Sequence, residues 1–388
     1  MSADISSDYR AILGGDGSPA LGRKVATRAD LMIDDSVVVP NLAILDANVH
    51  KDAQAATRTT IAGLSVIDPA GVLTPGTAAS LLDPINEASI RLWMGVDHED
   101  GRLSEFGPGL ELVPVCTCIL YDVEIVSSAD GTAITATGKD RSALLSDRKF
   151  TDPYQVAAGT NFTTYLSALI ANRDPRASFD FAATTDVTPR ITLQAGDSSD
   201  PLKDATEGAA ACGMELFVSP MGDWTLQPVS SFADATADWV FRRGGSGLVE
   251  LRRRRTREGV FSGVIASGEG SGNGVPSRAE AWDTDPTSPT YYLGRFGPVP
   301  DFLTSNLITS VGQATRAAQA RLRSRLGRME SVSWACAPNP AVQENDIAQV
   351  VDPSGVLVDA LYVVDTVDLP FAPGATMGVT TRTVTGGN

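Results

Sequence analysis

The sequence predicts an α+β fold in which β-structure predominates. Runs rich in Val, Ile and Leu alternate with turn sequences toward both ends of the 388-residue chain, and helical patterns are confined to a few segments. Gly (36) and Pro (23) are plentiful, which favours short strands joined by many turns. Hydrophobic residues make up 43%, enough for a sizeable core, and the length favours two or three folded units.

Strand patterns dominate the N-terminal part. Residues 35–45 and 58–67 are rich in Val, Ile and Leu, and residues 90–96 alternate apolar and polar side chains as a half-buried strand does. A long strand pattern over 113–126 and a return strand over 132–137 flank a turn sequence, which predicts a hairpin.

Helical patterns appear in the middle part. Residues 161–171 place several apolar side chains on one helical face. Asp200 followed by Pro201 is typical of an N-cap and a proline at the first helical position. The helix that starts there is expected to reach Cys212 and to end at Gly213, which tolerates the left-handed conformation of a C-terminal cap.

The last part contains the clearest helix pattern, over residues 310–327. Ser310 and Gln313 fit a capping box, and Gly327 is placed to close the helix. A mostly extended, arginine-bearing pattern over 248–267 precedes it, and three strand patterns follow it at 330–337, 347–351 and 356–367.

This order of patterns predicts three parts. A β-rich N-terminal domain is expected over 1–150, a small α/β segment over 151–240, and a β-rich domain with one long helix over 241–388. No repeat of fixed period runs through the chain.

The net charge of −16 argues against partners that are polyanions. Proteins that bind nucleic acid or anionic membranes usually carry the opposite balance. An acidic surface would repel DNA, which suits the lining of a channel through which DNA slides, although the charge can equally serve solubility alone. The N-terminus does not resemble a signal peptide, and no apolar run approaches the ~18 residues that span a bilayer. We therefore expect no sequence-specific nucleic-acid partner, no membrane contact, and synthesis in a cytoplasm.

Catalytic and metal-binding motifs find little support. Only His50 and His98 occur, and neither lies near a nucleophile motif. The acidic run 97–101 lacks the spacing of a calcium loop, and a solvated turn is the better interpretation. The glycine-rich run 268–274 is followed by a proline instead of a helix, so a loop is favoured over a phosphate site. The sequence predicts no enzyme activity, no metal and no cofactor.

A local run of arginines stands out in this acidic chain. Alternate arginines on a strand point to opposite faces, which makes a continuous nucleic-acid surface improbable. Two interpretations stay open: charge compensation against an acidic neighbouring copy, or a solvated strand edge that resists aggregation. The candidate subunit-interface residues are Arg242, Arg243, Arg252, Arg253, Arg254, Arg255 and Arg257.

Three stretches, in order, span most of residues 110–367 and resemble the hub proteins of long-tailed phage baseplates. In the first, a strand pair leads into Gly138-Lys139-Asp140-Arg141-Ser142, which is similar to the family's Gly/Ala-x-Asp-x-Ser element. In the second, the small-residue run 209–213 precedes a hairpin. In the third, an alanine-rich helix precedes Asn345-Asp346, where the family has Gly-Asp. The overall style is also similar to siphophage tail-tip and minor tail proteins of phages that infect actinobacteria.

The resemblance implies a fold with two tail-tube-like β-barrel domains around an inserted α/β segment. It implies a structural virion protein at the tail tip, assembled as a ring, typically a homotrimer, that leaves a passage for DNA ejection. The partners implied are further copies of the chain, tail-tube or distal tail proteins, the tape-measure protein, and receptor-binding or fibre proteins. The competing classes are a tail-associated cell-wall or glycan hydrolase and a module that binds host glycans.

Overall fold

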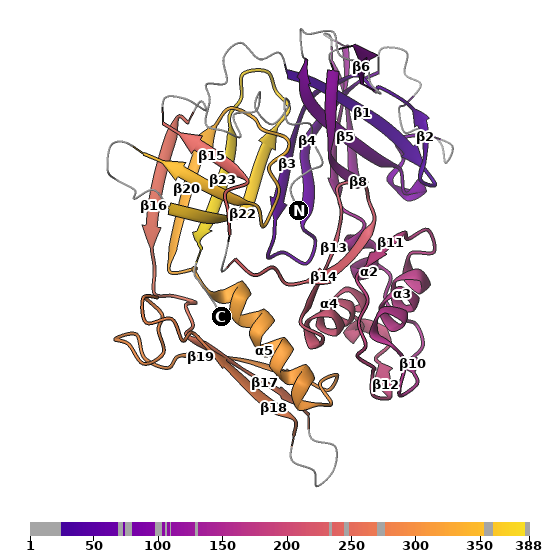
Figure 1. Ribbon diagram of the computed structural model, residues 1–388. Helices are drawn as coiled ribbons and strands as arrows, with labels where there is room; N and C mark the ends of the chain where they lie inside the picture. Colours follow the sequence, from indigo (N-terminus) through magenta and orange to yellow (C-terminus); the bar gives the residue numbers. More distant parts are fainter. Residues whose placement is uncertain are drawn as a thin grey trace.

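Strand pairing organises most of the chain. The computed structural model describes residues 25–68, 73, 80–97, 103–104, 107–108, 110–128, 131–232, 235–243, 248–269, 276–352 and 360–384. A thirteen-stranded sheet forms the upper layer of the molecule, and the helices with three of the smaller sheets form the lower layer (Figure 1). The fold is α+β and rich in β-structure, as predicted. None of the helices in these ranges is long and apolar enough to span a membrane.

The first half of the large sheet is built from the N-terminal strands. They are β1 (Val25–Ile33), β2 (Ser36–Val39), β3 (Ile44–Asp52), β4 (Thr59–Ile67), β5 (Ser89–Asp97), β8 (Leu110–Ser128) and β9 (Gly131–Lys139). Their order is β3-β4-β9-β8-β5-β1-β2, with antiparallel neighbours throughout. Short elements lie on both sides of β5 along the chain. The 3-10 helix η1 (Pro84–Asn86) precedes β5, and β6 (Leu103–Ser104) and β7 (Gly107–Pro108) follow it.

The second half comes from the C-terminal part. Its strands are β15 (Trp239–Arg242), β16 (Glu250–Arg255), β20 (Glu330–Cys336), β21 (Ile347–Val351), β22 (Ala360–Pro370) and β23 (Met377–Thr383). The order is β16-β20-β23-β22, and β21 with its parallel neighbour β15 branches from the start of β22.

One strand pair joins the two halves. The end of β22 runs antiparallel to the end of β3, from Thr366 opposite Asp52 to Pro370 opposite Asn48. Buried side chains of both halves, such as Leu92 in β5 and Trp334 in β20, belong to one continuous hydrophobic core. Among the described strands the sheet ends at β16 on one side and β2 on the other, and no pairing between them closes it.

The middle of the chain forms the right-hand part of the lower layer in Figure 1. Its elements are α2 (Ser142–Asp147), β10 (Tyr154–Val156), α3 (Phe162–Arg173), β11 (Phe179–Phe181), β12 (Ile191–Leu193), η2 (Gly196–Ser198), α4 (Pro201–Ala211), β13 (Met214–Val218) and β14 (Trp224–Pro228). Small sheets β10-β12 and β11-β14-β13 accompany the helices.

A segment inserted between β16 and β20 completes the lower layer. It contains β17 (Gly263–Gly268), β18 (Arg278–Trp282), β19 (Pro300–Ser305) and α5 (Val311–Arg325). Its apolar side chains, including Val264 and Leu322, share a second core with Tyr165 of α3 and Ala209 of α4. The buried apolar residues of β17 and α5 therefore pack with the middle segment and not with the core of the sheet strands that flank them in sequence.

The local patterns around the helices are confirmed. Asp200 accepts a hydrogen bond from the Lys203 amide at 3.0 Å, so it caps α4. Gly213 follows α4 with φ +73°, and a Cβ there would stand 2.9 Å from the Arg316 carbonyl oxygen of α5. Ser310 and Gln313 form a capping box in α5.

Two strand predictions need correction or completion. The extended pattern over 248–267 is two strands in different sheets, because a turn with Gly259 at φ +68° redirects the chain between β16 and β17. The hairpin predicted over 113–137 is β8 with β9, and its turn residues 129–130 lie outside the described part. Likewise β22 begins at Ala360, and residues 353–359 of the predicted last strand and its turn are not described.

Candidate functional site

The predicted arginine run is divided between two strands. Arg242 ends β15, which pairs with β21, whereas Arg252, Arg253, Arg254 and Arg255 lie in β16, which pairs with β20. These branches face each other across the core, where the Phe241 and Trp334 rings lie 5.0 Å apart between centroids. The run is therefore not one continuous surface.

Two of the arginines already share one carboxylate partner within the chain. Arg253 donates to both carboxylate oxygens of Glu330, at 3.0 and 2.8 Å, and Arg255 donates to the same group at 2.6 Å. The Glu330 side chain is only 6% exposed. Burial alone would raise the pKa of Glu330, but the hydrogen bonds and charges of the two arginines outweigh it and lower that pKa. This cluster serves the pairing of β16 with β20.

The other arginines are exposed as well. Arg252 is 74% exposed and lies 2.8 Å from exposed Glu250, while Arg254 also points to solvent. Arg243 lies 3.6 Å from buried Asp352, and the Arg257 guanidinium lies 5.2 Å from the centre of the Phe296 ring. Because its only described strand partner is β20, β16 offers a basic strand edge.

The opposite end of the sheet has a different character. Strand β2 pairs only with β1 among the described strands and exposes Val37 and Val38 by 48% and 42%. The acidic turn residues Asp34 and Asp35 precede it, both with positive φ. One end of the sheet is thus basic, and the other is apolar beside two carboxylates.

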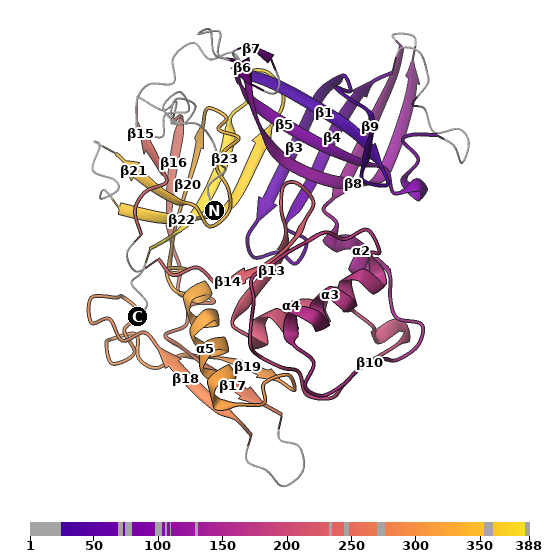
Figure 2. The same cartoon turned by 45° about the vertical axis from the view of Figure 1, so that its right-hand side comes forward.

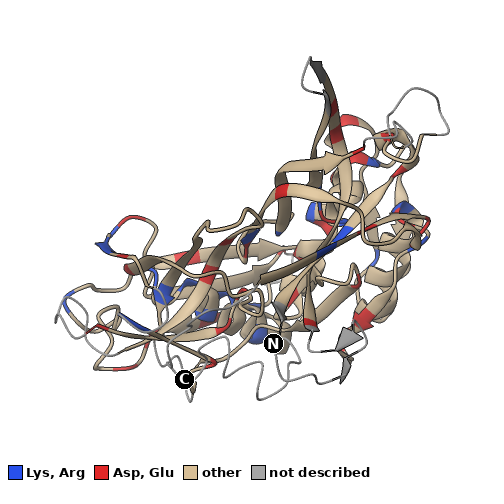
Figure 3. Ribbon diagram, turned by 90° about the horizontal axis from the view of Figure 1, so that it is seen from above, with Lys and Arg blue, Asp and Glu red and all other residues tan. Residues whose placement is uncertain are grey.

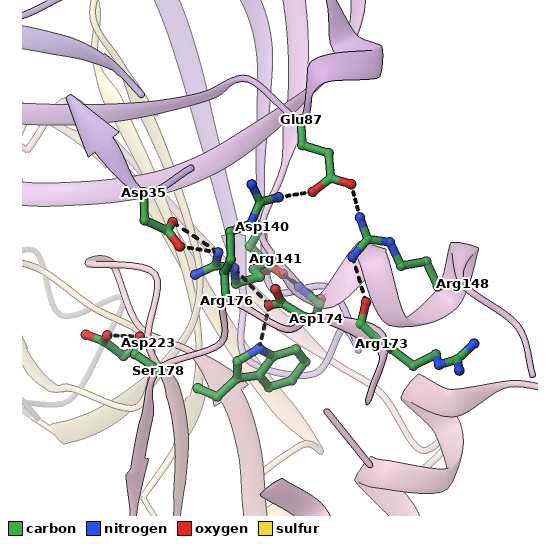
Figure 4. Close-up of polar contacts among 12 residues, drawn as sticks. Asp35, Glu87, Asp140, Arg141, Arg148, Arg173, Asp174, Arg176, Ser178 and Asp223 are labelled. Atoms are coloured by element: carbon green, nitrogen blue, oxygen red, sulfur yellow. Dashed lines mark hydrogen bonds and ion pairs between the residues drawn. The ribbon is translucent and has the colours of Figure 1, made fainter. Parts of the chain in front are cut away.

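A group of ion pairs connects the N-terminal half of the sheet to the middle segment (Figure 4). Arg141 donates to Asp35 at 2.7 Å and to Asp174 at 2.9 Å, and Asp174 is fully buried. Arg176 bridges Asp34 and Glu87, and Glu87 also binds Arg148. We call this set the ionic junction; its members are Asp34, Asp35, Glu87, Arg141, Arg148, Asp174 and Arg176.

Asp140, the acidic residue of the Gly138–Ser142 element, has a structural task beside this junction. Its buried carboxylate accepts hydrogen bonds from the Thr59 amide at 2.7 Å and the Ser142 amide at 2.9 Å, and another from the Ser142 hydroxyl. Burial raises the pKa of Asp140, and these hydrogen bonds oppose the increase. The element therefore fastens the start of α2 to β4.

Charge is mixed over the part of the molecule that the structure describes. Seen from above, basic and acidic segments are interspersed in Figure 3. The described residues contain no group of three or more His, Cys, Asp or Glu side chains placed to hold a metal ion. His50 contacts Asp368 through Nδ1 at 2.7 Å on an exposed part of the sheet. His98 and residues 270–274 lie outside the described ranges.

Searches with the sequence find no matching family model and no curated relative. Solved structures do match. The tail protein from Neisseria meningitidis MC58 superposes with a TM-score of 0.61 at 12% identity, covering 92% of this chain and 96% of that one. The 43 kDa tail protein of prophage MuSo2 from Shewanella oneidensis gives 0.59 at 14% identity, with 92% and 99% covered.

A third structure comes from a secretion system. The Escherichia coli c3393 protein, described as a type VI secretion component similar to the T4 tail proteins gp27 and gp5, gives 0.51 at 8% identity, with 93% and 77% covered. All three resemblances extend over nearly the whole of the present chain. The chain therefore has the fold that these tail and secretion-system proteins share.

Proposed function

We propose that the protein is a structural component of a phage tail, located in the baseplate or tail tip of the virion, which works by assembly and not by catalysis. The observation that carries this proposal is the match to two tail proteins, one of them from a prophage, over more than 90% of both chains. Antibody labelling of virions in electron microscopy tests the location. A protein absent from tails, or one that clears peptidoglycan, would contradict it.

We further propose that copies of the chain form a closed ring, a homotrimer, around a passage for DNA. Each copy would contribute two tail-tube-like domains, within 1–150 and 241–388, around the inserted segment 151–240. A sheet with two unlike ends supports this idea, since contacts between different surfaces of identical subunits close into rings. The tail tube, distal tail, tape-measure and receptor-binding or fibre proteins are the proposed neighbours.

The arginine run supplies the proposed subunit interface, and its outward-facing side chains on β16 form the centre of that interface. Arg253 and Arg255 are committed to Glu330, whereas Arg252 and Arg254 point outward from the β16 edge. Basic side chains on this edge would meet the acidic surface of the next copy and set its register. Arg242, Arg243 and Arg257 would flank that contact.

Charge reversal tests this interface. Arg252→Glu with Arg254→Glu should weaken assembly by on the order of 100-fold, because like charges placed across an interface cost several kcal/mol. Light scattering and native mass spectrometry over a dilution series would measure it. The matched control is Lys203→Glu with Arg278→Glu, which changes the net charge by the same amount. Both residues are exposed, on α4 and β18. Unchanged assembly of the edge variant would reject this interface.

A further inference from the structure

A cavity of about 200 Å³ lies where the large sheet meets the lower layer beneath its C-terminal half. In both views α5 lies directly below this half of the sheet (Figures 1 and 2). The walls come from the connection between β3 and β4, from β13 and the chain after β14, from α5, and from β23. The cavity therefore touches the structural units of both hydrophobic cores. We call it the arginine pocket.

Positive charge prevails on the walls of the arginine pocket. Arg58, Arg321, Arg323 and Arg382 line it, and Glu215 is the acidic residue among its lining residues. Arg58 binds Glu215 at 2.8 Å, while Arg321 binds Asp301 at 2.7 Å, away from the lining. Within the described part of the chain, the side chain of Arg323 makes no ion pair or hydrogen bond.

One wall residue, Arg382, is itself buried beside another arginine. Arg382 is only 4% exposed on its side chain and pairs with Asp365. Burial and the neighbouring charge of Arg328 lower the pKa of Arg382 to about 10. The pKa of Arg328 is itself lowered by burial and then by Arg325. A buried cation is costly unless opposite charge compensates it, and here the compensation is incomplete.

The remaining wall is apolar. Met214, Val229, Phe232 and Leu303 line it beside several alanines. The space corresponds to about six or seven water molecules at ~30 Å³ each. Guanidinium groups bind the oxygens of phosphates and carboxylates in a forked geometry, so such a group would find donors on one side and an apolar surface on the other.

We propose that the arginine pocket binds a small organic oxyanion, whose phosphate or carboxylate group contacts Arg323 and Arg58 and whose apolar part lies against Met214 and Phe232. The bound anion would supply the charge that the walls lack. Because it touches units of both cores, it would also stabilise their mutual arrangement, as any ligand of the folded state does. This inference does not depend on ring assembly.

The test uses the full-length protein with phenyl phosphate, inorganic phosphate and citrate as probes. We expect saturable binding by calorimetry and a rise in Tm beyond that produced by sodium chloride at equal ionic strength. Phenyl phosphate should bind more tightly than inorganic phosphate because it also fills the apolar wall. Tight binding of citrate instead would assign the carboxylate as the anionic group.

The variant Arg323→Gln should weaken binding by at least about 10-fold, since it removes a charged donor, and Arg323→Lys should retain part of the affinity. Arg278→Gln, on the exposed surface of β18, is the matched control and should bind as the wild type does. Stabilisation that merely follows ionic strength would overturn the proposal. So would equal affinity of the Arg323→Gln protein, whose Tm without ligand verifies that it is folded.

Discussion

The two places where the large sheet meets the lower layer solve the same packing problem in opposite ways. At the ionic junction three arginines meet four carboxylates, and the pairs extend down to fully buried Asp174. At the arginine pocket four arginines line an open space. Three of them have a carboxylate partner, and Arg323 has none among the described residues. The difference teaches that charges which all have partners can pack without a cavity, whereas an arginine without a partner lies beside open space that a counter-ion could occupy.

The largest effect is expected at the ionic junction. Arg141→Ala would leave the Asp174 carboxylate buried without its cation, and one of its oxygens already lacks a hydrogen-bond partner in the described part. The free energy of unfolding should fall by about 3–5 kcal/mol. Urea denaturation followed by tryptophan fluorescence measures it, with Arg278→Ala as a surface control. A loss below about 1 kcal/mol would mean that the junction does not hold the layers together.

The free energy of unfolding is expected to depend on pH through Asp346, which is next to Asn345 in the lining of the arginine pocket. Burial raises the pKa of Asp346 to about 6, despite hydrogen bonds from the Gln343 amide and the Trp239 indole. A raised carboxyl pKa contributes stability that is complete below the unfolded pKa and is lost as pH rises through the folded value.

The wild type should therefore lose about 1–3 kcal/mol relative to Asp346→Asn between pH ~4 and pH ~7. Urea denaturation of both proteins across this range gives the difference directly, and other carboxyl groups cancel from it. A difference that is flat with pH would show that Asp346 titrates normally.

A smaller effect is expected from removing a cation of the arginine pocket. Arg58→Ala breaks the pair with Glu215, but Glu215 keeps its hydrogen bond from Gln227 at 2.9 Å, and the other cations remain close. We expect a loss of about 1–2 kcal/mol. The same urea titrations measure this loss. If it equals the loss in Arg141→Ala, the proposed difference between the ionic junction and the arginine pocket is wrong.

The smallest effect is expected from Arg323→Gln without ligand. No partner is lost within the described residues, so the free energy of unfolding should stay within about 0.5 kcal/mol of the wild type. Thermal melts in chloride buffer would check it. A large destabilisation would show that Arg323 has a structural partner, and the pocket would then be less unbalanced than its lining indicates.

Much of the local structure could be predicted from single stretches of sequence. Asp200 with Pro201, and Ser310 with Gln313, mark helix starts because each side chain satisfies a backbone amide within three residues. Asn345 stands where the resembling family has glycine, and it adopts φ +67°, which a turn-forming asparagine tolerates.

The candidate sites could be predicted only in part from local sequence patterns. The arginine run was visible, but its division was not, because Glu330 lies 75 residues beyond Arg255. Arg141 and Asp35 are 106 residues apart, and nothing in either local pattern announces the other. The arginine pocket draws its cations from three distant parts of the chain, which composition alone cannot bring together.

By itself the sequence determined the strand-rich character, the helix boundaries and the scarcity of catalytic groups, since these depend on contacts within a few residues. Only the tertiary structure decided that β22 joins β3, that residues 263–326 share a core with the middle segment, and which arginines remain free. The reason is that burial and ion pairing between distant segments depend on how whole layers pack. Local hydrogen bonding sets the elements but not their partners.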